Sequence, residues 1–225
     1  MSHAHKALIG VSIGFQSSTF VERKLTELLA TGCKVKLIEE TDGPASRTLK
    51  RQGVEYEHLS ASKRFLRIQT QKILNDIDYV VIFWDGSTLT NFVFEAKFQK
   101  KPIKIIPIEV TKVVNRDQEH DYDYYIGRGT PWGNPYHVGG GEGRYSREEA
   151  IRLFREHFKN SILADESKHH GLLAMRGYKL ACHCKPLACH GDVIAKYINS
   201  IDPETQEVET LMNESDKTPQ EEHHS

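Results

Sequence analysis

The chain has 225 residues, of which 38% are hydrophobic and 27% charged, and its net charge is −1. This composition is typical of a globular protein with one large or two small domains, and it excludes an overall basic field that would attract nucleic acid. No apolar run approaches the roughly 20 residues of a membrane-spanning helix, and residues 1–6 lack a signal-peptide pattern, so we expect a soluble cytoplasmic protein.

Short apolar runs alternate with helical patterns through the first half of the chain. The runs predict strands at residues 7–14, 35–38, 54–59, 79–83 and 103–108. Helical periodicity is found between them, at residues 19–32, 45–52, 65–74 and 92–98. Strands that alternate with helices form right-handed crossovers. We therefore predict an α/β fold, with a Rossmann-like, mainly parallel sheet over residues 6–110.

The second half differs in its pattern. Residues 111–123 are polar without periodicity and are predicted to be a linker, and residues 127–143 form a glycine-rich loop. A capping box at Ser146 and Glu149 opens a long helix, and a short helix at 172–175, a strand at 178–182 and a helix at 192–198 follow. We expect a smaller α/β or α+β domain over residues 124–200. Residues 201–225 are acidic and are predicted to be a disordered tail.

Three loops follow predicted strands and share the expected carboxyl edge of the sheet, where open α/β sheets bind ligands. Glycines there let the backbone approach a phosphate, and the free amides of the next helix favour an anion. The same sequences are typical of ordinary strand–helix turns, so both interpretations remain open. The candidate ligand-binding residues are Gly14, Gln16, Ser17, Asp42, Gly43, Arg47, Asp85, Gly86, Ser87 and Thr88.

The sequence FWDGST at residues 83–88, followed by a helix and by KKPIKIIPI at 100–108, resembles the last unit of the SLOG superfamily of Rossmann-like domains. The resemblance implies a nucleotide or nucleotide-derived ligand, which some members cleave at the N-glycosidic bond and others only sense. Two departures favour binding over hydrolysis. Phe15-Gln16 stands where many relatives carry Ser-Arg, and Val93 stands where the hydrolases carry a glutamate; Glu95 lies on another helix face.

A cysteine- and histidine-rich segment, CHCKPLACH, occupies residues 182–190. Three thiolates and one imidazole are the ligands of a structural zinc site, with Cys182, Cys184, Cys189 and His190 as the candidates. A second interpretation is a reactive Cys189, activated by the amides of the following helix and by His190. A third is a set of small buried residues with no chemical role.

The loop IGRGTPWGNP at residues 126–135 combines three functional side chains. Trp132 can stack on a base, Arg128 can bind a phosphate or carboxylate, and Asn134 can bind a polar edge. Alternatively, Trp132 fills a small core and Asn134-Pro135 forms a turn.

Together, this loop and RGYKLACHCKPLACHGDV at 176–193 resemble the family catalogued as domain of unknown function 4326, found in phage and bacterial proteins. The resemblance covers residues 124–199. It implies that Arg128, Trp132, Asn134, Cys182, Cys184, Cys189, His190 and Asp192 form one site. The family supplies no activity.

These patterns predict a protein that binds a nucleotide or a nucleotide derivative. If it is an enzyme, it attacks an N-glycosidic or related bond, with His190 or Asp192 as acid or base, Cys189 as nucleophile and Arg128 on the substrate. The alternatives are a non-catalytic sensor of a nucleotide signal and an accessory protein of nucleic acid, which the net charge disfavours. Zinc is the cofactor to test for. A homo-oligomer is compatible with the sequence, and no membrane partner is expected.

Overall fold

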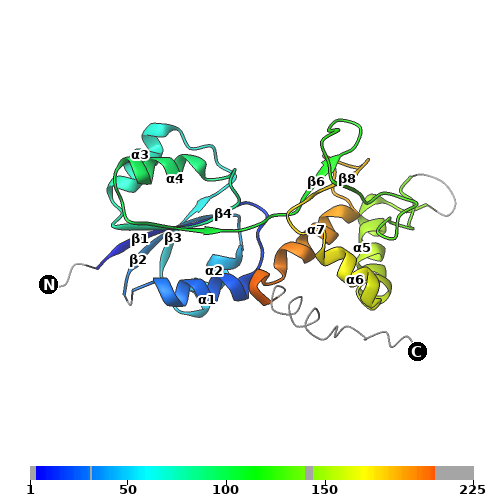
Figure 1. The fold of residues 1–225 in the computed structure, drawn as a ribbon, viewed down its shortest axis with the longest axis horizontal. Helices are drawn as coiled ribbons and strands as arrows, with labels where there is room; N and C mark the ends of the chain where they lie inside the picture. The colour runs from blue at the N-terminus through cyan, green and yellow to red at the C-terminus, as the bar shows by residue number, and fades with distance from the viewer. Residues whose placement is uncertain (1–3, 31, 140–143, 206–225) are drawn as a thin grey trace, which may run out of the picture.

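The computed structural model describes residues 4–30, 32–139 and 144–205, which form two lobes side by side (Figure 1). The N-terminal lobe holds a five-stranded sheet in the order β3-β2-β1-β4-β5, and every neighbouring pair is parallel. Its strands are β1 (Lys6–Val11), β2 (Lys34–Glu39), β3 (Tyr56–Ser60), β4 (Tyr79–Trp84) and β5 (Ile103–Pro107).

Two helices cover each face of this sheet, as Figure 1 shows. Helices α1 (Ser18–Leu28) and α2 (Pro44–Arg51) pack on one face, and α3 (Arg67–Asn75) and α4 (Thr90–Phe98) pack on the other. The central strands β1 and β4 are buried on both faces, because their side chains serve two separate cores. The predicted Rossmann-like parallel sheet is therefore confirmed.

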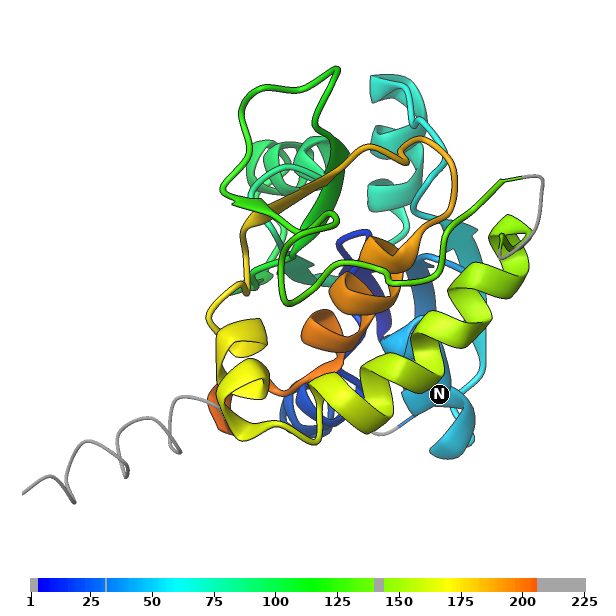
Figure 2. The ribbon, with the colours of Figure 1, turned by 90° about the vertical axis from the view of Figure 1, so that its right-hand side faces the viewer.

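The C-terminal lobe has a three-stranded parallel sheet in the order β6-β8-β7. Its strands are β6 (Lys112–Asn115), β7 (Tyr124–Tyr125) and β8 (Lys179–Cys182). Its helices are α5 (Arg147–His157), which runs into a π-helical turn at Phe158–Ile162, then α6 (Glu166–Leu173) and α7 (His190–Ser200). Figure 2 shows these three helices from the side of this lobe. They enclose a core of their own with β8.

The predicted linker over residues 111–123 is wrong for its first part. Val113 and Val114 lie in β6, which pairs with β8 through Lys112↔Lys179 to Asn115↔Cys182. Two apolar residues between polar neighbours are too short a pattern to distinguish an edge strand from a linker. The strand forms because β8, which is more than 60 residues away in sequence, offers its hydrogen-bonding edge.

The two lobes are joined by buried polar contacts. The Asn199 side chain accepts the Thr111 N–H (2.9 Å) and donates to the Thr111 carbonyl (3.0 Å). The backbone carbonyl of Asn199 accepts the Gln16 N–H (3.0 Å). Arg23 of α1 pairs with the buried Asp202, which follows α7 (2.8 Å). The segment at 201–205 is thus ordered against α1, which corrects the start of the predicted tail; residues 206–225 lie outside the described part.

Among the described residues, no helix combines the length and apolarity that crossing a membrane requires.

Candidate functional site

The three glycine loops of the N-terminal lobe lie at one edge of the sheet. Gly14, Gly43 and Gly86 follow β1, β2 and β4, whose carboxyl ends meet at this edge because the strands are parallel. Gly14 and Gly86 have positive φ angles of 92° and 81°, which glycine adopts without strain. The predicted arrangement of the three loops is therefore confirmed.

The amides of the second loop are already bonded to an acid of the chain itself. The Glu39 carboxylate is 1% exposed and accepts the N–H groups of Ala45 (3.0 Å) and Ser46 (2.5 Å) at the start of α2. A Cβ at Gly43 would overlap this carboxylate. Burial raises the pKa of Glu39, against the opposing effect of these hydrogen bonds. An anion at this helix terminus would have to displace Glu39.

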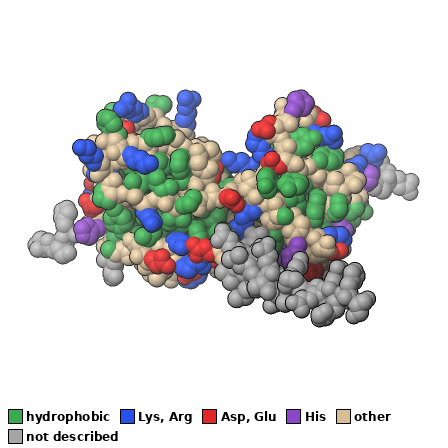
Figure 3. Space-filling view, viewed as in Figure 1, with side chains coloured by type: hydrophobic (Ala, Val, Ile, Leu, Met, Phe, Trp, Pro, Cys, Tyr) green, Lys and Arg blue, Asp and Glu red, His purple; other side chains and the backbone are tan. Residues whose placement is uncertain are grey.

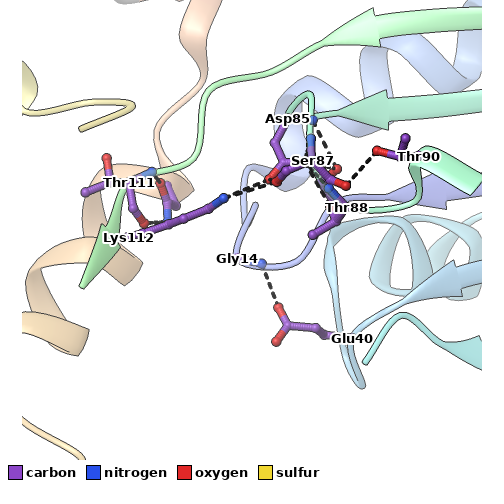
Figure 4. A network of polar contacts seen from close by, with 10 residues as sticks. Gly14, Glu40, Asp85, Ser87, Thr88, Thr90, Thr111 and Lys112 are labelled. Atoms are coloured by element: carbon purple, nitrogen blue, oxygen red, sulfur yellow. Dashed lines mark hydrogen bonds and ion pairs between the residues drawn. The ribbon is translucent and has the colours of Figure 1, made fainter. Parts of the chain in front are cut away.

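The amides of the loop after β4 are likewise bonded to a carboxylate of the chain itself, that of Asp85 (Figure 4). Asp85 accepts the N–H groups of Ser87 (3.0 Å) and Thr88 (2.8 Å), as well as both hydroxyls of these residues. It also pairs with Lys112 of the C-terminal lobe (3.2 Å). Burial alone would raise the pKa of Asp85, but the hydrogen bonds from Ser87 and Thr88 outweigh it and hold the pKa far below its usual range.

The first loop contacts both its neighbour loop and the other lobe. The Gly14 N–H donates to Glu40 (2.9 Å), as Figure 4 shows. Arg47 donates to the Gln16 carbonyl (3.2 Å), to Ser18 and to the Asp42 carbonyl. Ser17 is the N-cap of α1, which the sequence placed near Thr19. A ligand that binds at these loops would therefore have to break hydrogen bonds that the loops already make within the chain.

The C-terminal lobe contains a cavity of about 290 Å³ that unites both predicted sequence segments. Cys182, Cys184, Cys189 and His190 line it from the CHCKPLACH segment, and Arg128 and Asn134 line it from the 126–135 loop. The structure thus brings these six candidate residues of the two segments together around one cavity. The remaining walls come from residues that were not themselves candidates, although three of them belong to the same two segments: Tyr125, Gly127, Tyr136, Val138, Arg147, Ile151, His183 and Ala188.

The three thiols form a triangle in the cavity wall. The sulfurs of Cys182 and Cys189 are 3.4 Å apart, and the Cys184 side chain packs against the same core and lines the same cavity. Cys182 and Cys189 are buried, whereas Cys184 is partly exposed. Hydrogen bonds from Cys182, Cys189 and Arg147 lower the pKa of Cys184. Its bonds to the other two thiols, together with burial, raise the pKa of Cys189. Cys184 is also the most exposed of the three thiols, which makes it the candidate for the thiolate of this cluster.

His190 is the first residue of α7 and is 6% exposed. Its Nε2 lies 2.8 Å from the Ile126 carbonyl, which only an N–H can satisfy, so Nε2 carries the proton and Nδ1 keeps a free lone pair. Burial lowers the pKa of His190, which keeps the ring neutral. No described residue makes a hydrogen bond to Nδ1, so the ring offers the cavity a base.

Asp192 has a structural partner instead of a place in the cavity wall. Its carboxylate accepts the Cys189 N–H (2.9 Å), which caps α7, and pairs with Lys185. Trp132 likewise packs away from the cavity, against Gly171 of α6 and the core of the lobe. Asn134 accepts the Tyr136 N–H (2.9 Å) and donates to the Ala150 carbonyl (3.3 Å), which shapes the turn beside the cavity.

Two arginines and two tyrosines give the cavity its binding character. Arg147 begins α5 and also donates to the Ala188 carbonyl (3.2 Å), and the exposed Arg128 stands in the preceding loop. Tyr125 and Tyr136 supply flat apolar surface. Arg147 was not among the predicted site residues, because it lies inside the capping pattern that begins α5. A basic residue at a helix N-terminus, where the macrodipole disfavours it, was the available signal.

An Asp–His pair at the rim was also missed. His183 Nδ1 lies 2.8 Å from Asp117, a residue of the presumed linker, and the His183 ring meets the edge of Tyr125. The Arg116 guanidinium lies over the Tyr125 ring, 4.6 Å from the ring centre. Asp117 follows β6 and His183 follows β8, so the two residues meet because these strands pair. The sequence could have indicated the Asp–His pair only if this strand pairing had been predicted.

The described residues include no group of three or more His, Cys, Asp and Glu side chains arranged as a metal centre. The proton on His190 Nε2 is donated to a backbone carbonyl, so Nδ1 is the ring nitrogen whose lone pair would be available to a metal. The zinc interpretation stays a prediction for elemental analysis.

Residues 110–200 match the family described as Domain of unknown function (DUF4326). Over 102 residues, the chain is 43% identical to the uncharacterized 12.4 kDa protein of the nrdA-td intergenic region of Enterobacteria phage T4. The aligned residues make up 45% of this chain and 90% of the phage protein. Through its C-terminal lobe, the chain belongs to this family.

Two solved structures show weaker likeness. MurG of Acinetobacter baumannii is 14% identical with a TM-score of 0.33, over 49% of this chain. The UDP-GlcNAc 2-epimerase of Neisseria meningitidis is 12% identical with a TM-score of 0.30, over 75% of this chain. The chain spans 40% and 54% of the lengths of these two proteins.

Proposed function

We propose that the C-terminal cavity binds a small anionic molecule of the nucleotide class and that Cys184 attacks it. One observation carries this proposal: the Cys184 thiol, the open Nδ1 of His190 and the guanidinium of Arg147 line a single cavity. A volume of about 290 Å³ is at the lower end for small-molecule sites, which are typically about 300–1,000 Å³.

Each wall of the cavity suits one part of such a ligand. Guanidinium groups bind phosphate through two parallel hydrogen bonds, and tyrosine rings stack on a base or cover a sugar. The cavity also lies at the N-terminus of α7, whose dipole favours an anion beside Cys189 and His190. The carboxyl edge of the N-terminal lobe is less suitable, because Glu39 and Asp85 already occupy its amides.

In the proposed reaction, Cys184 is the nucleophile and His190 is the general base. The Cys184 sulfur attacks an electrophilic carbon of the ligand, the bond from that carbon to its leaving group breaks, and the leaving group takes up a proton. Water then attacks the carbon–sulfur intermediate while His190 Nδ1 accepts the proton of the water, which restores the thiolate. The bond we propose first is the N-glycosidic bond, so the products would be a free base and a sugar phosphate.

The test combines binding and product analysis. The full chain is screened against nucleoside mono-, di- and triphosphates and dinucleotides by thermal shift, and mixtures are examined by mass spectrometry. At 100 times its dissociation constant a ligand adds about 2.7 kcal/mol of stability. We expect Arg147→Gln to lose the shift and Arg152→Gln to keep it, because Arg152 on the same helix pairs with Glu149 and Glu156 instead.

Cys184→Ser should keep the thermal shift and lose the products. A shift that both arginine variants keep would contradict the location of the site. If the wild-type chain binds a nucleotide and releases it unchanged, the second candidate, a non-catalytic sensor, replaces the enzyme. The burial of two of the three thiols favours that candidate.

A further inference from the structure

We infer that the thiol triangle of the C-terminal cavity is a site of reversible oxidation by hydroperoxides, whose product is a disulfide between Cys182 and Cys189. This chemistry goes beyond the proposed function. It requires no nucleotide, so it can be tested without one.

The first argument is the proximity of the two buried sulfurs. Cys182 ends β8, Cys189 is the N-cap of α7, and their sulfurs are 3.4 Å apart. A disulfide has an S–S distance of about 2.05 Å, so a small side-chain movement closes the bond. Both side chains are held by the core of the lobe, so the fold already pays the entropy of bringing them together.

The second argument is the exposure of the third sulfur. Cys182 is 1% exposed and Cys189 is 2% exposed, whereas Cys184 is partly exposed and lines the cavity. An oxidant therefore reaches Cys184 first. Oxidation-sensitive cysteines are accessible and lie beside a resolving thiol, and Cys184 lines the cavity together with Cys182 and Cys189.

The steps balance with a hydroperoxide as oxidant. The Cys184 thiolate attacks the terminal oxygen, the O–O bond breaks, and an alcohol or water leaves; the product is a sulfenic acid. The Cys189 thiol attacks this sulfur and expels water, which forms a Cys184–Cys189 disulfide. The Cys182 thiol then attacks the Cys189 sulfur, which yields the Cys182–Cys189 disulfide and returns Cys184 to the thiol form. One peroxide is reduced and two thiols are oxidised.

The disulfide changes the remaining thiol. Cys182 and Cys189 line the same cavity as Cys184, and the disulfide removes the S–H groups of both as donors. Arg147 remains as the neighbouring donor. Oxidation should therefore slow alkylation of Cys184, so peroxide would switch off the nucleophile of the cavity.

The experiment uses the full, reduced, metal-free chain and hydrogen peroxide at one equivalent. Peptide mapping without reduction should find Cys182 joined to Cys189, and dithiothreitol should reverse the link. The Cys33→Ser variant should give the same map, since Cys33 lies in the core of the other lobe. Sulfinic or sulfonic acid at Cys184 without a disulfide, or dimers joined through Cys184, would overturn the inference.

Two variants test the order of the steps. Cys184→Ser should form the Cys182–Cys189 disulfide at least about tenfold more slowly, because the accessible thiolate is gone. Cys182→Ser should stop at the Cys184–Cys189 disulfide. The wild-type map does not depend on whether these variants fold. A nucleotide that binds while no disulfide forms would sink this inference and leave the proposed function standing.

Discussion

At the scale of single residues, the three cysteines differ because of their surroundings. They share one segment and one cavity, yet one is accessible and two are buried. The sequence pointed to Cys189 as the reactive thiol because it precedes a helix. The structure favours Cys184 for this role, since it is the most exposed of the three thiols and its pKa is lowered. The spacing C-x-C-x₄-C does not show which of the three sulfurs is buried or which of them are in contact.

We expect iodoacetamide to modify Cys184 first. Its lowered pKa means that the thiolate persists as the pH falls below the range of free cysteine, whereas the raised pKa of Cys189 keeps that thiol protonated. Peptide mapping after brief alkylation at pH 6 measures the order. Cys33, buried in the N-terminal lobe, serves as the internal control. Faster modification of Cys189 than of Cys184 would contradict the assignment.

A second prediction at this scale concerns Asp85. Because its pKa is lowered in the folded state, ionised Asp85 stabilises the fold above about pH 4, and this stability is lost as the pH falls through the folded pKa. Asp85→Asn should cost about 1–3 kcal/mol at pH 7. Urea unfolding at pH 7 and at pH 3.5 checks both the size and the sign. A cost that grows toward acid would show that other groups dominate.

At the scale of elements, the sequence predicted most strands and helices of the N-terminal lobe. Apolar runs such as 79–83 are long enough to be unambiguous, and helix caps lie close to their predicted residues. β6 and β7 were missed because each is short and gains its stability from β8, which is distant in sequence. The helix predicted at 172–175 begins earlier, at Glu166, where Asp165 caps it by accepting the Lys168 N–H.

The start of α7 provides a test of Asp192. We expect Asp192→Ala to destabilise the lobe by about 0.5–1 kcal/mol, since it removes the acceptor of the Cys189 N–H at a partly exposed helix terminus. The rate of Cys184 alkylation should change little. A loss of alkylation with unchanged thermal stability would instead assign Asp192 to the chemistry of the cavity.

At the scale of the whole molecule, contacts at the C-terminal end of α7 join the lobes, together with the ion pair of Lys112 and Asp85. Figure 3 shows them separated by a notch with basic side chains at its base, so contact is concentrated on a small region. Asn199 is 4% exposed and satisfies both backbone groups of Thr111. The sequence could not predict this contact, because an asparagine near the end of a helix has no pattern that identifies its partner.

Replacing this residue should loosen the connection. We expect Asn199→Ala to cost about 2–4 kcal/mol, because it leaves two buried backbone groups of Thr111 without partners. Limited proteolysis should then cut near residues 108–112 sooner than in the wild-type chain. Ser200→Ala, the next residue on α7 and exposed, is the matched control. Equal cleavage in both variants would show that Arg23 and Asp202 suffice to hold the lobes together.

The internal carboxylates of the N-terminal lobe also bear on how this fold could change its specificity. Glu39 and Asp85 each occupy amides that, in a nucleotide-binding relative of the fold, would be free for phosphate. Two acids at the ends of two different strands thus satisfy these donors from within the chain. We expect a variant that lacks either acid to leave its donors open to another anion.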